Sequence, residues 1–245
     1  MSETKTHRLV SKPQVSARYL ADFMAATRQG ERSIIRGCKY RPIARLIQHR
    51  VAKNIIGTYL RLGKEHLEEL IEQAHGLRDR MASDDFDREL LDNNADYVER
   101  FAHVASGLVL PAADLTPPGD CPPLVINGTT VTVDLCFRLR RTVKNNRATN
   151  KIRVGAATLR YARGKPLPPE VGAWQSAILM GYLGQDALQD NAQPEGKLCL
   201  TIDAYLGICH PAPTDAVRRF KNIQAACATI AESWDNVAPP AGAIL

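Results

Sequence analysis

Hydrophobic residues recur at helical spacing through most of the first 110 residues. Ser16 is suited to capping a helix, and the following segment ARYLADFM predicts an amphipathic helix that Gly30 should end. A second, longer helix is expected to start at Pro42 and to continue through Leu60. Two further helical patterns, GKEHLEELIEQAHGLRDRM and SDDFDRELLDNNADYVERFAHVASGL, complete this part of the chain.

The hydrophobic period changes from 3.6 to 2 after residue 123. The turn signal Asn127-Gly128 separates residues 124–126 from TTVTVDLCFRL, which predicts a β-hairpin whose second strand runs to Leu139. KIRVGAATLRYA and LCLTIDAYLGICH also have strand patterns, while PPEVGAWQSAILMGYL and TDAVRRFKNIQAACATIAESW are helical. The predicted order is β-β-β-α-β-α.

Five prolines fall within residues 111–123, a density that no helix tolerates. We therefore predict a helical region over 1–110, a proline-rich linker over 111–123, an α/β core over 124–235 and an unanchored tail over 236–245. The fold class is α+β, with a small mixed sheet flanked by helices.

Charge is distributed unevenly along the chain, which carries a formal net charge of +6. Residues 1–53 contain 12 Lys and Arg against 3 Asp and Glu, residues 54–123 contain 6 against 14, and residues 124–245 contain 14 against 9. Two basic blocks around an acidic one indicate a positively charged working surface.

Two stretches concentrate the positive charge. In RLRRTVKNNRATNKIR, which joins two predicted strands, no acid accompanies the cations Arg138, Arg140, Arg141, Lys144, Arg147, Lys151 and Arg153. The second stretch, residues 28–53, supplies Arg36, Lys39, Arg41 and Arg45. Since Lys and Arg neutralise phosphates, we predict that the two stretches share one face that binds DNA or RNA. A solvated surface or an anionic protein partner remains the alternative.

The sequence lacks the signals of several classes of protein. No apolar run is long enough for a membrane span, and the first residues lack the apolar stretch of a secretory signal, so we expect a cytoplasmic protein with no membrane partner. The six cysteines have no zinc-site spacing, and phosphate-loop, dinucleotide and serine-hydrolase motifs are missing. We expect no cofactor.

Residues 124–210 resemble the PD-(D/E)XK nuclease superfamily, particularly its RecB-like branch. That family has an Asp near the end of one strand, an acid-x-Lys motif on the next strand, and then a helix that carries Gln and Tyr. In TVDL, Asp134 matches the first position. Gln175 and Tyr182 resemble the Gln and Tyr of the helix, but they are spaced more widely than the family's Gln-x-x-x-Tyr. The resemblance implies a restriction-endonuclease-like sheet.

The second motif departs from the family, because Arg160-Tyr161-Ala162 stands where the acid and the lysine are expected. An arginine there would repel Mg²⁺, so we expect a catalytically degenerate nuclease fold that binds nucleic acid without cleaving it. The resemblance suggests an accessory subunit of a nucleic-acid-processing or defence assembly, with other protein subunits as partners. Two alternatives stay open: an active, Mg²⁺-dependent nuclease using Asp134, Asp203 and Lys165, and a protein-interaction scaffold.

Overall fold

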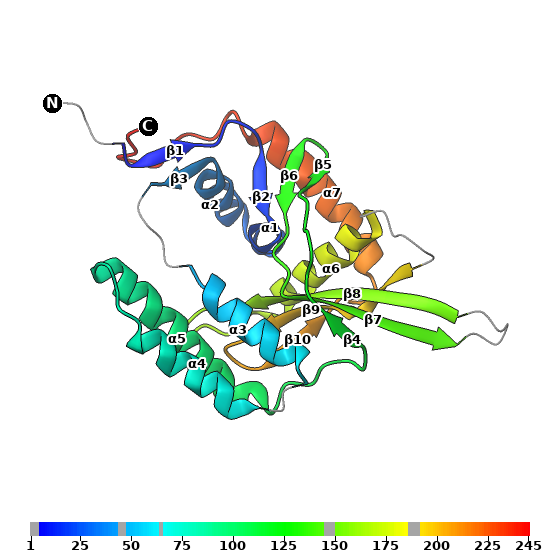
Figure 1. Cartoon of the computed structure of the whole chain (residues 1–245). Helices are drawn as coiled ribbons and strands as arrows, with labels where there is room; N and C mark the ends of the chain where they lie inside the picture. The colour runs from blue at the N-terminus through cyan, green and yellow to red at the C-terminus, as the bar shows by residue number, and fades with distance from the viewer. Residues whose placement is uncertain (1–4, 44–47, 64–65, 145–149, 186–191) are drawn as a thin grey trace.

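A mixed five-stranded sheet lies at the centre of the protein, whose computed structural model describes residues 5–43, 48–63, 66–144, 150–185 and 192–245 (Figure 1). Its strand order is β10-β9-β8-β7-β4. The strands are β4 (Asp114–Thr116), β7 (Phe137–Lys144), β8 (Asn150–Arg160), β9 (Ala192–Asp203) and β10 (Ile208–Pro211). β8 and β9 are parallel, as expected for strands joined through the crossover helix α6 (Pro169–Gln185), and the other pairs are antiparallel. The α+β class is confirmed.

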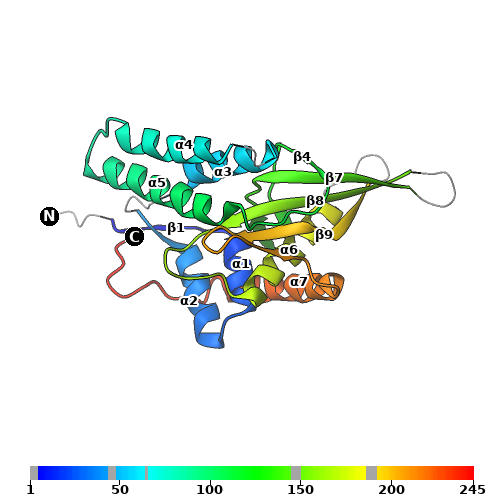
Figure 2. The same ribbon diagram turned by 90° about the horizontal axis from the view of Figure 1, so that it is seen from below.

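Helices cover both faces of this sheet and create two hydrophobic cores (Figure 2). One face packs on α3 (Arg50–Arg61), α4 (Leu67–Asp79) and α5 (Asp85–Ala105). The other packs on α6, α7 (Ala216–Ser233), α1 (Ala17–Met24) and α2 (Arg28–Lys39). Side chains alternate between faces along a strand, so the neighbours Ala156 and Ala157 belong to different cores.

Two smaller sheets flank the central one. β2 (Gln14–Ser16) pairs in parallel with β6 (Thr129–Thr132), and β6 pairs with β5 (Leu124–Ile126) across the predicted hairpin. Asn127 and Gly128 both have positive φ, 43° and 83°, which confirms the two-residue turn. β1 (His7–Leu9) pairs with β3 (Tyr40–Pro42).

The N-terminal helices differ from the prediction. Ser16 caps α1 as expected, its Oγ accepting from the Tyr19 N–H at 3.2 Å. Gly30 does not end this helix; α1 ends at Met24, and Gly30 lies in the first turn of α2, where its N–H bonds to the Thr27 cap. Pro42 ends β3 instead of starting a helix. Helix α3 begins at Arg50, and residues 44–47 of the predicted helix lie outside the described residues.

The strand predicted to continue to Leu139 is interrupted. β6 ends at Thr132 and β7 begins at Phe137, and the two strands belong to different sheets. Residues 133–136 cross from one sheet to the other, although Val133 and Leu135 stay buried. The prediction was wrong here because an alternating pattern also suits an extended crossing that buries every second side chain.

The predicted boundaries also change. The region 1–110 contains three short strands, and the linker 111–123 contains β4, which pairs with β7. Residues 236–245 are anchored: the Ile244 carbonyl accepts from Thr6 N–H at 2.9 Å, and the Val237 carbonyl accepts from the Tyr40 hydroxyl at 2.9 Å. Each core contains side chains from before and after the linker, so the two parts fold together.

Candidate functional site

One end of the central sheet gathers the residues that the family resemblance singled out. Asp203 is the register partner of Arg160 in the β8–β9 pair. Asp134 lies three residues before Phe137, whose partner Ala157 lies three residues before Arg160. The antiparallel β7–β8 hairpin therefore places Asp134, Arg160 and Asp203 at the same end of adjacent strands.

Asp134 is engaged by a lysine. The crossing segment 133–136 presents its side chain, which is 70% exposed, and the Lys53 ammonium of α3 lies 2.5 Å from its Oδ2. This is an ion pair between residues 81 positions apart in sequence. The neutralising cation comes from the N-terminal region and not from the basic hairpin that follows Asp134 in the chain.

Asp203 has a structural role. Its side chain is buried, with 2% of the residue exposed. One carboxylate oxygen accepts the Leu167 N–H at 2.8 Å, and the other accepts from Tyr205 at 2.9 Å and Leu206 at 3.2 Å. Since both oxygens fix the backbone of two loops, Asp203 holds the end of the sheet together. Lys165, the third candidate catalytic residue, is exposed in the loop between β8 and α6.

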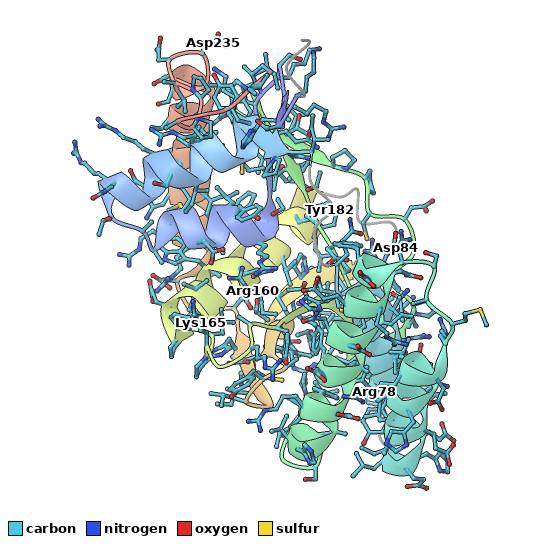
Figure 3. All side chains as sticks on the ribbon, turned by 90° about the vertical axis from the view of Figure 1, so that its left-hand side faces the viewer. Arg78, Asp84, Arg160, Lys165, Tyr182 and Asp235 are labelled. Atoms are coloured by element: carbon cyan, nitrogen blue, oxygen red, sulfur yellow. The ribbon has the colours of Figure 1, made fainter. Side chains whose placement is uncertain are left out.

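Arg160, which is labelled in Figure 3, contacts both α1 and α6 at this end of the sheet. Its guanidinium donates to Asp22 at 2.6 Å, to the Gln175 side chain at 3.1 Å and to the Arg18 carbonyl at 3.1 Å. Burial lowers the pKa of Arg160, and the hydrogen bond and charge of Asp22 oppose that shift. The arginine thus ties β8 to α1 and α6. Tyr182 does not join it, because its hydroxyl donates to the Pro122 carbonyl.

A basic cleft of about 570 Å³ opens beside Asp134. Arg18 of α1 and Arg50 and Lys53 of α3 line it together with His49, residues 133–136, Pro118, Gly119 and Cys121. Arg18 also lines an adjoining pocket of about 130 Å³, whose walls include Arg160, Lys165 and Asp203. Asp134 is the acidic group lining the larger cavity, and Lys53 already neutralises it, so the cleft has an excess of positive charge.

An aromatic cluster adjoins the cleft through His49. His49 makes edge contacts with Tyr97 and Tyr161, whose own rings stack at 4.0 Å. Burial lowers the pKa of His49, and the charges of Lys53 and Arg18 lower it further. His49 is therefore disposed to stay neutral, and neither its Nδ1 nor the Tyr97 hydroxyl has a hydrogen-bond partner within the described part of the chain.

The cations of the β7–β8 hairpin divide into two groups. Arg138 donates to the Pro118 carbonyl, Arg141 forms a bidentate pair with Glu195 of β9, and Arg153 donates to Gln193. These three side chains are therefore engaged by other parts of the protein. Lys144 and Lys151 are exposed near the tip, and Arg140 is exposed further back on β7, where Asp114 of β4 is its register partner. Arg147 lies outside the described residues.

The predicted N-terminal basic stretch is scattered. Lys39 is buried, and its ammonium donates to the carbonyls of Trp234, Asp235 and Val237 at the end of α7. Arg36 is exposed on α2, Arg41 lies on β3, and Arg45 lies outside the described residues.

Both ribbon views place α2 far from the outer ends of β7 and β8 (Figures 1 and 2). The α2 part of the second stretch therefore does not share a face with the hairpin, whereas Arg50 and Lys53 of the same stretch line the cleft. Two chain segments that are both basic need not meet, since the arrangement of the elements decides where each one lies.

The cleft depends on three residues that sequence reasoning did not single out as a site. Arg50 and Lys53 stood within the basic stretch, but no local pattern linked them to Asp134. Arg18 lies in the first turn of a predicted amphipathic helix, outside both basic stretches. No signal in the sequence marked it as part of a site.

Across the described ranges, no three His, Cys, Asp or Glu side chains group as a metal site would require. None of the described helices combines the length and the apolar character needed to cross a bilayer. No protein-family model, no curated protein and no solved structure matches the chain.

Proposed function

We propose that this protein binds DNA or RNA in the basic cleft and along the β7–β8 hairpin, on a restriction-endonuclease-like core that does not cleave. The observation that carries the proposal is the convergence of Arg18, Arg50 and Lys53 on one cleft beside Asp134. A phosphodiester backbone is a repeating anion, and cations from separate elements can contact its successive phosphates.

The placement of Asp134 and Arg160 supports the nuclease-like core. In the superfamily that the sequence resembles, the strand Asp and the acid-x-Lys motif work together, and here the corresponding positions share one end of the β7–β8 hairpin. Gln175 of α6 contacts Arg160, as a residue of the family's following helix would contact that site. By the same resemblance, we propose a role as an accessory subunit of a nucleic-acid-processing or defence assembly.

The state of the acidic groups favours binding over cleavage. Asp134 is paired with Lys53, Asp203 is committed to backbone N–H groups, and an arginine stands at the position of the second metal-binding acid. A divalent cation needs several free oxygen ligands, and these groups offer few. An active nuclease would have to break both the Lys53 pair and the Asp203 loop contacts.

The wild-type protein tests the proposal directly. Fluorescence anisotropy with labelled single- and double-stranded DNA and RNA should detect binding that weakens steeply between about 50 and 200 mM salt. The same oligonucleotides should remain intact with Mg²⁺ or Mn²⁺. Lack of binding at low salt would reject the proposed function, and metal-dependent cleavage that Asp134→Ala abolishes would replace it with the active-nuclease alternative.

A further inference from the structure

A second cavity, larger than the cleft, lies between α2 and α7. It has a volume of about 950 Å³ and is lined by α1, α2, α7 and the residues after α7. The hairpin and the residues of the basic cleft are not part of its walls. We call this cavity the α2–α7 groove, and the proposed nucleic-acid binding does not account for it.

One wall of the groove is a ridge of arginines. Arg28, Arg32 and Arg36 follow one another at intervals of four residues on α2, so they lie along one side of the helix. All three are exposed, and none takes part in an ion pair with another residue of the described ranges. Their charges are therefore available to a partner.

The opposite wall and the floor are uncharged over most of their length. Ala226, Thr229 and Ser233 repeat along α7, and their small side chains leave the groove open. Phe23 and Ile35 are nearly fully buried beneath the floor, whose accessible apolar surface comes from Met24, Val237 and Ala238. An apolar partner would gain by covering these three side chains, because burying them removes hydrocarbon from water.

The groove is pre-formed. Lys39, one turn beyond Arg36, reaches across to three carbonyls at the end of α7, the closest being that of Trp234 at 2.6 Å. The Tyr40 hydroxyl bonds to the Val237 carbonyl. These contacts fix α2 against the end of α7, so that a ligand would not have to order the two walls.

We infer that the α2–α7 groove binds an acidic amphipathic helix of a partner protein. Its apolar side would cover the floor, and its carboxylates would face the arginine ridge, in the manner of helix-in-groove recognition. A nucleic acid fits less well, because phosphates gain nothing from the floor and would face Glu31 and Glu232 on the rim. Separate carboxylates on a helix can be spaced to avoid those two acids.

Two synthetic helical peptides test the inference by fluorescence anisotropy on the full chain. Both carry leucines along one side; the first carries glutamates along the other, and the second carries lysines in their place. The glutamate peptide should bind at least about tenfold more tightly than the lysine peptide. Combined Arg28→Glu, Arg32→Glu and Arg36→Glu substitutions should abolish or invert this preference.

Two variants separate the groove from general charge effects. The combined substitutions Arg140→Glu, Lys144→Glu and Lys151→Glu change the net charge equally but lie on the hairpin, so the glutamate peptide should still bind. Thr229→Trp, at an exposed position of α7, should fill the groove and weaken the peptide about tenfold with an unchanged circular dichroism spectrum.

Four results would overturn the inference. These are equal affinity for both peptides, undiminished binding to the ridge variant or to Thr229→Trp, displacement of the peptide by an oligonucleotide, and self-association in sedimentation that the ridge variant loses. The third result would assign the groove to nucleic acid, and the fourth would assign it to a second copy of the chain.

Discussion

The two ends of the β7–β8 hairpin are both basic, but they hold their charge differently. At the cleft end, the Arg160 guanidinium contacts Asp22, Gln175 and a backbone carbonyl, and Lys53 pairs with Asp134. Towards the other end, Arg140, Lys144 and Lys151 are exposed along the strands, with Lys144 and Lys151 nearest the tip. A run of cations in the sequence marked the exposed end, whereas the end with a defined cavity was assembled from segments far apart in the chain.

Loss of Arg160 should have the largest effect on stability. Its side chain is 11% exposed, and removing it leaves Asp22 and the buried Gln175 without their partner. Arg160→Ala should lower the free energy of unfolding by about 3 kcal/mol. At the tip end of the same sheet, Arg141→Ala breaks a more exposed pair with Glu195 and should cost about 1 kcal/mol or less. Urea denaturation measures both values, and equal losses would contradict the distinction.

Charge reversal should separate the two ends in nucleic-acid binding. Arg18→Glu combined with Arg50→Glu should weaken binding about thirtyfold, because both residues line the cleft. Arg140→Glu combined with Lys144→Glu should weaken it about tenfold, because exposed tip residues meet phosphates without a surrounding cavity. Anisotropy titrations in one buffer compare the variants. A greater loss from the tip pair would transfer the main binding surface to the hairpin.

The smallest expected effect is on the pH dependence of stability. It concerns the cleft, where His49 lies, because the β7–β8 hairpin contains no histidine. Burial lowers the pKa of His49 in the folded protein, so the unfolded chain takes up its proton first. The contribution of His49 to stability is therefore complete above the unfolded pKa of about 6.5 and decreases as pH falls below it. His49→Gln should flatten the decline in the thermal midpoint below that pH.

The exposed His66 provides the control for this measurement. His66→Gln replaces an exposed imidazole in the same way and shows what the substitution itself does to the thermal midpoint. His210 is also buried in part, and burial lowers its pKa while Asp203 opposes the shift, so part of the slope should persist in His49→Gln. An unchanged slope in His49→Gln would show that the cleft histidine does not titrate differently in the folded and unfolded chains.

The sequence predicted the features that depend on local chemistry. The Ser16 cap, the Asn127-Gly128 turn, the α+β class and the helices of the second half all follow from residues within a few positions of one another. The proximity of Asp134 and Arg160 also follows from local structure. In an antiparallel pair, the residues just before the first strand lie beside the end of the second strand.

The features that depend on distant partners were not predictable in this way. Lys39 stands in a basic stretch that is typical of a surface. It is nevertheless buried, and its ammonium donates to the Trp234 carbonyl, 195 residues away in the chain. The three-residue strands β1, β2, β3 and β4 carry too few side chains to show a period, and they form because a neighbouring edge is available. The role of Asp203 depends on two loops that meet only in the fold.

The hydrogen bonds from Lys39 to the carbonyls after α7 limit how the chain can be divided. A fragment that ends in the proline-rich segment 111–123 would keep this lysine but lose the carbonyls of α7, leaving an ammonium group among the exposed apolar side chains of half a core. The complementary fragment would keep β7 to β10, α6 and α7 but lose α3, α4 and α5, which cover the other face of the sheet. The halves on either side of that segment are therefore not transferable modules, and the protein has to be expressed, dissected or fused as one cooperative unit.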